Sequence, residues 1–137
     1  MGLDEARVQS FLATKEVVVL ATVLATGAPL AMPMWFLHDP AALTMISVAE
    51  TQKVRNIRRD NRVCVVAEAV GGGGEISGVT VQGRAELLAD GPERRALIER
   101  FHGKYRGLQR LWGGRTMPAN RVMFRIVPSQ VRSWGLG

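Results

Sequence analysis

The sequence has a single cysteine, Cys64, which excludes an intrachain disulfide and a metal site built from several cysteines. It has only two histidines, His38 and His102, too few and too far apart in the chain for a metal site. It also lacks a run of about 18 apolar residues, the length that a membrane-spanning helix needs. The first residues lack the charged and then apolar layout of a signal peptide. We therefore expect a cytoplasmic protein with no metal site and no membrane association.

Acidic residues are in the minority, with 12 against 18 basic residues and a net charge of +6. This balance favours anionic ligands, among which nucleic acid has to be considered. The basic residues are spread through segments 53–62, 94–115 and 121–132, without a basic block of five or more. The strands also lack the interleaved exposed aromatic and basic residues of barrels that bind nucleic acid. We expect a small anionic ligand and no nucleic-acid partner.

The length of 137 residues predicts a single domain over residues 1–137, because domains commonly have about 100–200 residues. An apolar share of 47% is too high for a disordered chain. A chain of this size can bury one core and often leaves apolar surface for a partner subunit.

Hydrophobic periodicity and turn residues divide the chain into short elements. They predict helices over residues 4–14, 51–60 and 92–105, and strands over residues 17–24, 30–37, 43–48, 62–68, 78–88 and 122–134. Gly27 lies in the first turn, at a position that needs a positive φ. Pro33 has no N–H to donate, so its strand should be at a sheet edge, at a bulge or against a ligand.

Six strands joined by hairpins, with few and peripheral helices, predict a small antiparallel β-barrel that is closed or half-closed. The strands over 17–24 and 62–67 are apolar on both faces. In a small barrel this indicates a second apolar layer, which we expect to be a partner subunit. Residues 107–120 are Gly-rich and predicted to be irregular.

The junction between the strand at 43–48 and the helix at 51–60 is the best candidate for an anion site. A helix N-terminus offers unpaired N–H groups and the positive end of the helix dipole. Lys53 lies in the first turn, where a cation opposes the dipole unless an anion is present, and Arg55 follows it. Ser47 is the only hydroxyl on its strand face. A solvated helix face and a satisfied turn hydroxyl are the alternatives.

Six motifs occur in an order that resembles a known superfamily. They are Val19–Val23, Thr26–Pro29, Pro33–Phe36, the segment from Ser47 to Val63, Val81–Ala85 and Phe124–Trp134. Together they resemble the split β-barrel flavin-binding proteins, that is, pyridoxamine 5′-phosphate oxidase-like proteins and their deazaflavin-dependent relatives. The resemblance implies a six-stranded antiparallel split β-barrel and a homodimer with two cofactor sites at the subunit interface.

The resemblance also implies which residues bind the cofactor, either FMN or the deazaflavin coenzyme F-420. Its phosphate would lie on Ser47, Lys53 and Arg55, with Thr51 and Asn56 close by. Its ring would lie along the backbone of Pro33, Met34 and Trp35, with Thr22 within reach on the neighbouring strand. The positive charge favours F-420, whose tail carries several carboxylates. The sequence lacks the longer paired Arg and Lys strand pattern of the oxidases themselves, so we do not expect their vitamin substrate.

No acid–base pair or nucleophile stands out, and no catalytic residue is assigned. Hydride transfer needs none, because the cofactor supplies the chemistry and the protein positions it. We therefore expect an oxidoreductase that passes hydride between F-420 or FMN and a small organic substrate. The alternative is a non-catalytic protein of the same fold that binds a flavin, a deazaflavin or a tetrapyrrole. Residues 104–115 mix cations with aromatics and form either a lid over the site or a plain surface connection.

Overall fold

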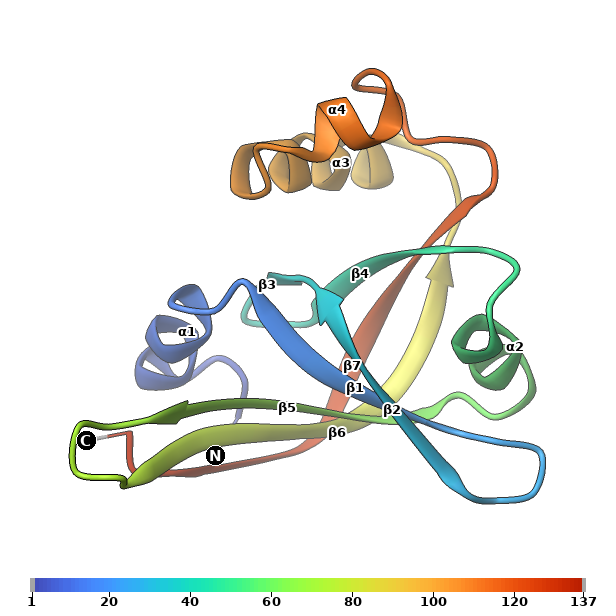
Figure 1. The fold of residues 1–137 in the computed structure, drawn as a ribbon. Helices are drawn as coiled ribbons and strands as arrows, with labels where there is room; N and C mark the ends of the chain where they lie inside the picture. The colour runs from blue at the N-terminus through green and yellow to red at the C-terminus, as the bar shows by residue number, and fades with distance from the viewer. Residues whose placement is uncertain (1, 137) are drawn as a thin grey trace.

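The computed structural model describes residues 2–136, which form one curled antiparallel sheet with helices at its periphery (Figure 1). The strands follow the order β2-β1-β5-β6-β7-β4-β3 across the sheet. Their bounds are β1 Val17–Val23, β2 Pro29–Trp35, β3 Leu37–His38, β4 Leu43–Val48, β5 Arg62–Val70, β6 Ile76–Leu88 and β7 Arg121–Trp134. The helices are α1 Ala6–Ala13, α2 Gln52–Arg59, α3 Pro92–Lys104 and α4 Leu108–Trp112. The predicted half-closed, mainly β architecture is confirmed.

The strand predicted over residues 30–37 is broken at Phe36, so the described sheet has seven strands rather than six. β2 and β3 follow one another in the chain but lie at opposite edges of the sheet. The backbone of Phe36 bonds to side chains instead of a strand. Its N–H donates to the Tyr105 hydroxyl at 2.9 Å, and its carbonyl accepts from Lys104 Nζ at 2.9 Å. These two side chains allow the chain to leave one edge and enter the other.

The main core fills the inner face of the sheet. Alternate strand residues point inward, and Leu20, Met45 and Phe124 are fully buried there. Helix α1 adds Val8 and Leu12 to the same core. Helix α2 lies against β1 and buries Val54 and Ile57, the two apolar residues of its sequence.

Helices α3 and α4 lie together at one end of the molecule, where β6 ends and β7 begins (Figure 1). They form a second apolar cluster with the strands, in which Phe101, Leu108 and Met123 are buried. The sequence predicted residues 107–120 to be irregular, whereas Leu108–Trp112 is a short helix. The helix is only five residues long and ends at Gly113 in the left-handed conformation, with φ of 73°. Because glycines flank this short helix, the sequence there indicates a loop rather than a helix.

The outer face of β2, β1 and β5 remains apolar in the single chain. Val17 and Trp35 are paired across β1 and β2, and their exposed fractions are 45% and 40%. Val19 is paired with both Pro33 and Val66, which continues the patch across three strands. Cys64 belongs to this outer face and is half-buried, although its position in an apolar strand would by itself suggest a core thiol. Burial raises the pKa of the Cys64 thiol.

Two local predictions from the first hairpin are confirmed. Gly27 has a φ of 87°, as its turn position requires. Pro33 lies in β2, which is an edge strand, so its missing N–H costs the sheet nothing on the free side.

Candidate functional site

A cavity of about 330 Å³ lies where edge strand β2 comes near β4, the strand next to the opposite edge. Five helix and strand segments contribute to it besides β2. The lining residues are Pro33, Met34 and Trp35 from β2, Ile46, Ser47 and Val48 from β4, Lys53 from α2, Phe101 from α3, Leu108, Leu111 and Trp112 from α4, and Arg121 from β7. We call it the seam cavity. Its position follows from the incomplete closure of the sheet.

Two hydroxyl groups lie at the β4–α2 end of the seam cavity. The Ser47 side chain is almost fully buried, and its Oγ donates to the Val48 carbonyl at 3.0 Å. Thr51 is the N-terminal capping residue of α2, and its Oγ1 donates to the same carbonyl at 3.0 Å. The two hydroxyl oxygens are 3.4 Å apart. Thr51 makes no capping bond to the helix, and no side chain within residues 2–136 accepts a hydrogen bond from the first N–H groups of α2.

Lys53 lies in the first turn of α2, at this end of the helix. It is half-buried, and no ion pair or hydrogen bond links it to a described residue. Desolvation lowers the pKa of the Lys53 amine, since burial disfavours the charged form. A cation in the first turn also opposes the helix dipole. A bound anion would relieve both costs. Lys53 and the helix amides fit a phosphate group, and the two hydroxyls could join them by exchanging their bond to the Val48 carbonyl for one to the ligand.

Among the described residues, no carboxylate lines the seam cavity, although Arg121 lines it together with Lys53. The remaining walls are mostly aliphatic or aromatic, with Trp35, Phe101 and Trp112 among them. The cavity therefore has cations at one part of its surface and apolar walls elsewhere. This combination suits a ligand with a flat apolar ring and an anionic group.

The β2 wall of the cavity is held in place by Tyr105, the residue that follows α3. The rings of Trp35 and Tyr105 stack with centroids 4.3 Å apart and planes only 5° from parallel. The Tyr105 hydroxyl donates to the Glu16 carbonyl at 2.7 Å while it accepts the Phe36 N–H. Burial raises the pKa of Tyr105 to about 12, so it stays a neutral hydroxyl donor. The Trp35 ring is therefore fixed from one side and exposed on the other.

The structure brings together five of the nine residues expected at the cofactor: Pro33, Met34, Trp35, Ser47 and Lys53. Thr51 is next to this group, through its contact with Ser47. Arg55 does not line the cavity, and its guanidinium donates instead to Gln52 Oε1 at 3.2 Å. At helical spacing Arg55 is two residues from Lys53, so the two side chains point to different sides of α2.

Thr22 and Asn56 form a buried structural pair away from the seam cavity. Asn56 is fully buried, and its Nδ2 donates to Thr22 Oγ1 at 3.0 Å. The side-chain oxygen Oδ1 of Asn56 accepts from Gln52 Nε2 at 2.7 Å. These bonds join α2 to β1, so the two residues position the helix in the single chain.

Sequence reasoning missed Arg121, and it left residues 104–115 open between a lid over the site and a plain surface connection. Arg121 is about 70 positions away from Lys53 in the chain, and only the pairing of Val48 with Arg121 in the β4–β7 ladder places it here. For α4 a signal existed, because residues 104–115 mix aromatics and cations. The structure places Trp112 against the His102 ring, with centroids 5.3 Å apart, and His102 Nε2 lies 2.9 Å from the Arg115 carbonyl.

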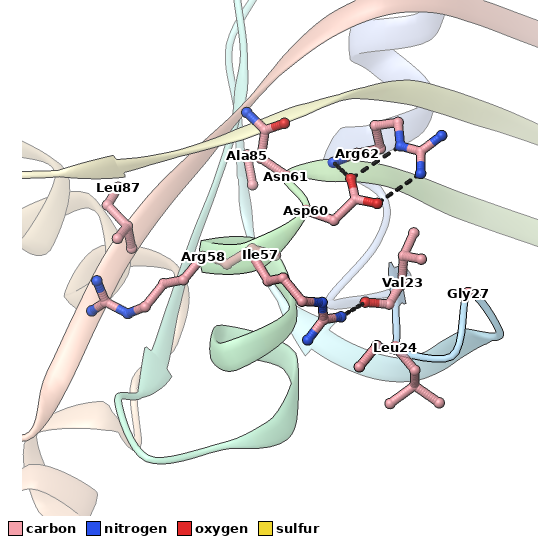
Figure 2. Close-up of a pocket in the computed structure, with 12 residues that line it drawn as sticks. Val23, Leu24, Gly27, Ile57, Arg58, Asp60, Asn61, Arg62, Ala85 and Leu87 are labelled. Atoms are coloured by element: carbon pink, nitrogen blue, oxygen red, sulfur yellow. Dashed lines mark hydrogen bonds and ion pairs between the residues drawn. The ribbon is translucent and has the colours of Figure 1, made fainter.

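A second and larger concavity, about 750 Å³, lies at the opposite end of α2 (Figure 2). Arg59 donates there to the Val23 carbonyl, and Arg62 pairs with Asp60 through nitrogen–oxygen distances of 3.0 and 2.7 Å. That pairing lowers the pKa of Asp60 to about 2. The cations at this end already complement the negative end of the helix dipole, so they need no ligand. None of the expected cofactor residues lines this concavity.

Other kinds of site are not found within residues 2–136. No group of three or more His, Cys, Asp or Glu side chains is placed to hold a metal ion. None of the helices there has the length and apolar character needed to traverse a bilayer. His38 lies within hydrogen-bonding distance of Gln9 Oε1, and burial lowers its pKa.

A family model described as pyridoxamine 5′-phosphate oxidase matches residues 4–135, nearly the whole chain. The chain belongs to this family. The superfamily resemblance drawn from the six motifs is thereby confirmed. No curated protein matches the sequence significantly.

Solved structures of similar proteins agree with membership of the pyridoxamine 5′-phosphate oxidase family. A conserved hypothetical protein from Mycobacterium tuberculosis is 27% identical, with a TM-score of 0.78, over 96% of this chain and 84% of its own. An FAD-binding protein from Mesorhizobium loti is 25% identical, with a TM-score of 0.75, over 90% of this chain and 87% of its own. The heme storage protein HutZ from Vibrio cholerae is 17% identical, with a TM-score of 0.77, over 96% of this chain and 94% of its own. At this identity the likeness shows a shared fold alone.

Proposed function

We propose that this protein is an oxidoreductase that binds a flavin or deazaflavin in the seam cavity and passes hydride between it and a small organic substrate. The observation that carries the proposal is the half-buried Lys53 at a helix N-terminus. Within the described part of the chain it has no ion-pair partner, and no carboxylate lines its cavity. A redox cofactor with a phosphate and a flat ring matches both parts of that cavity. The family and the FAD-binding structural relative support a flavin-type cofactor.

The residues of this chain would bind and position the cofactor. Lys53 and Ser47, with Thr51 beside them, would hold the phosphate through charge-assisted hydrogen bonds. Pro33, Met34 and Trp35 would form one wall along the ring, and the aromatic side chains of α3 and α4 would exclude water. The cofactor itself supplies the hydride chemistry when it is bound. No proton-transfer role is assigned to a residue of this chain.

FMN and F-420 are both within the proposal. The net charge of +6 favours F-420, because its tail carries several carboxylates that basic residues attract. Lys53 and Arg121 line the seam cavity, and none of its described lining residues is a carboxylate that would repel an anionic ligand.

We also propose that the protein works as a homodimer with the cofactor at the interface. Val17, Val19 and Trp35 leave an apolar outer face on β1 and β2. Pro33 and Trp35 belong to this face and also line the seam cavity. A second copy covering the face would therefore border the cavity and shield the cofactor.

The test is a titration of the purified protein with FMN and with F-420, followed by absorbance and fluorescence. We expect a Kd below about 100 μM for at least one of them, and at least a tenfold weakening, about 1.4 kcal/mol, in Lys53→Ala. The variant should keep the thermal unfolding midpoint of the wild type. No binding of either cofactor in this range would end the proposal, and an unchanged affinity in Lys53→Ala would show that the phosphate lies elsewhere.

The second candidate is a non-catalytic carrier of a flavin, deazaflavin or tetrapyrrole. It is favoured by the lack of an acid–base pair or nucleophile among the lining residues of the seam cavity. A turnover assay with a reductant and a panel of enones, quinones and tetrapyrroles separates the two. Turnover with any of them supports the oxidoreductase, whereas tight cofactor binding without turnover supports the carrier.

A further inference from the structure

Arg121 lies beside the proposed phosphate site although it is distant in the sequence. It is the first residue of β7 and pairs with Val48, the last residue of β4. The Ala49 N–H donates to the Asn120 carbonyl at 2.8 Å, which extends the contact to the residues that lead into α2. The start of β7 is therefore joined to the same junction that carries Ser47 and Lys53.

The Arg121 guanidinium keeps free donors. It is half-buried, and it lines the seam cavity together with Lys53. One nitrogen, Nη1, donates to Asn120 Oδ1 at 2.6 Å, and no described carboxylate pairs with the group. A guanidinium has five N–H donors, so this bond to Asn120 orients it and leaves others for a ligand.

Arg55, which the sequence motif suggested, differs from Arg121 in its exposure and in its position relative to the seam cavity. Its side chain is exposed and bonds along the helix to Gln52 Oε1. It does not line the seam cavity. The two arginines therefore form a matched pair for an experiment, since only one of them reaches the cavity.

We propose that Arg121, in place of Arg55, is the second cation that binds the phosphate of the cofactor. The inference rests on the proposed function, because it needs a phosphate-bearing ligand in the seam cavity. Lys53 would act as a point charge, and Arg121 would contribute the planar fork that suits two phosphate oxygens. Arg121 is the first residue of β7, so the phosphate site depends on the pairing of β4 with β7. Helices α3 and α4 directly precede β7 in the chain.

The experiment compares FMN with riboflavin, which has the same ring but no phosphate. Both are titrated by flavin fluorescence into the wild type, Arg121→Ala, Arg55→Ala and Lys53→Ala. We expect Arg121→Ala to weaken FMN binding about tenfold, about 1.4 kcal/mol, and to leave riboflavin affinity within twofold. Arg55→Ala should leave both affinities within twofold. If the wild type prefers F-420, the same comparison uses F-420 and its chromophore without the phosphate-bearing tail.

The outcomes separate the two proposals. Suppose that Lys53→Ala loses FMN affinity tenfold, but Arg121→Ala loses no more FMN affinity than Arg55→Ala. This result overturns the role of Arg121 and leaves the proposed function standing. An equal loss for FMN and riboflavin in Arg121→Ala also overturns the role of Arg121, since it would reveal a structural effect. If Lys53→Ala has no effect, or the wild type binds neither cofactor, the proposed function fails and this inference fails with it.

Discussion

The proposed site needs a positive charge on Lys53. We expect the protonation of this amine to vary with pH and with the binding of a ligand. Desolvation lowers the pKa of the free amine from its ordinary value of 10.5, whereas a bound phosphate favours the charged form and raises it again. Binding must therefore take up a proton once the pH exceeds the lowered pKa, so affinity is highest below that pKa and falls as the pH rises through it.

We expect the FMN or F-420 affinity of the wild type to fall as the pH is raised from neutral toward 10.5, the ordinary pKa of the amine. Lys53→Ala should show a flatter dependence over the same range, because the titrating group is gone. Kd values measured across this range for both proteins check the point. Parallel pH profiles for the two proteins would mean that another group titrates on binding.

Thr22 is expected to matter for stability rather than for binding. Thr22→Val keeps the shape of the side chain but removes the oxygen that accepts from Asn56 Nδ2. Since Asn56 is fully buried, its donor would lose its partner, at a cost of about 1–3 kcal/mol in the free energy of unfolding. Urea unfolding measures this loss, and a cofactor titration of the folded variant should give the wild-type affinity. A large loss of affinity with unchanged stability would place Thr22 at the cofactor instead.

At the scale of elements, the break between β2 and β3 depends on a single helix end. Tyr105→Phe keeps the ring that stacks on Trp35 but removes the hydroxyl that accepts the Phe36 N–H and donates to the Glu16 carbonyl. We expect a loss of about 1–3 kcal/mol in unfolding free energy, because a buried N–H is left unpaired. Tyr105→Leu should lose about 0.5–1.5 kcal/mol more, since the stacked ring is also removed. Urea unfolding of the wild type, Tyr105→Phe and Tyr105→Leu measures both losses. Equal unfolding free energies for the three proteins would contradict the prediction.

The elements themselves could largely be predicted from the sequence, because their signals are local. The alternation in 78–88, the turn at Gly27 and the inward face of Val54 and Ile57 all arise from neighbouring residues. The break at Phe36 could not be predicted, since its backbone partners are Lys104 and Tyr105, far along the chain. Helix α4 was missed for a different reason, because five residues between glycines give no periodic pattern.

The candidate site shows the same limit. Ser47 and Lys53 follow from one strand-to-helix junction, and the structure places both in one cavity. Arg55 was chosen from its closeness in the sequence, whereas Arg121 reaches the cavity only through strand pairing. Thr22 and Asn56 were assigned from the superfamily resemblance, and in this chain they bond to one another.

At the scale of the whole molecule, the seam cavity and the apolar outer face of β1 and β2 lie next to each other. If a second copy covers that face, a charge at its centre should separate the subunits, because a buried unpaired cation is costly. We expect Val19→Lys to be monomeric by light scattering and to bind the cofactor more weakly, while the wild type is dimeric. Val70→Lys is the control, since Val70 is 63% exposed at the end of β5, away from Pro33 and Trp35. A monomeric wild type that binds cofactor fully would contradict the interface proposal.

The most direct test is a crystal structure of the protein grown with whichever cofactor, FMN or F-420, binds in solution. We predict electron density in the seam cavity, with the phosphate against Ser47, Lys53 and Arg121 and the ring along Pro33, Met34 and Trp35. Density in the concavity at the opposite end of α2, or a seam cavity filled by protein side chains in the crystal, would contradict the proposed site and function.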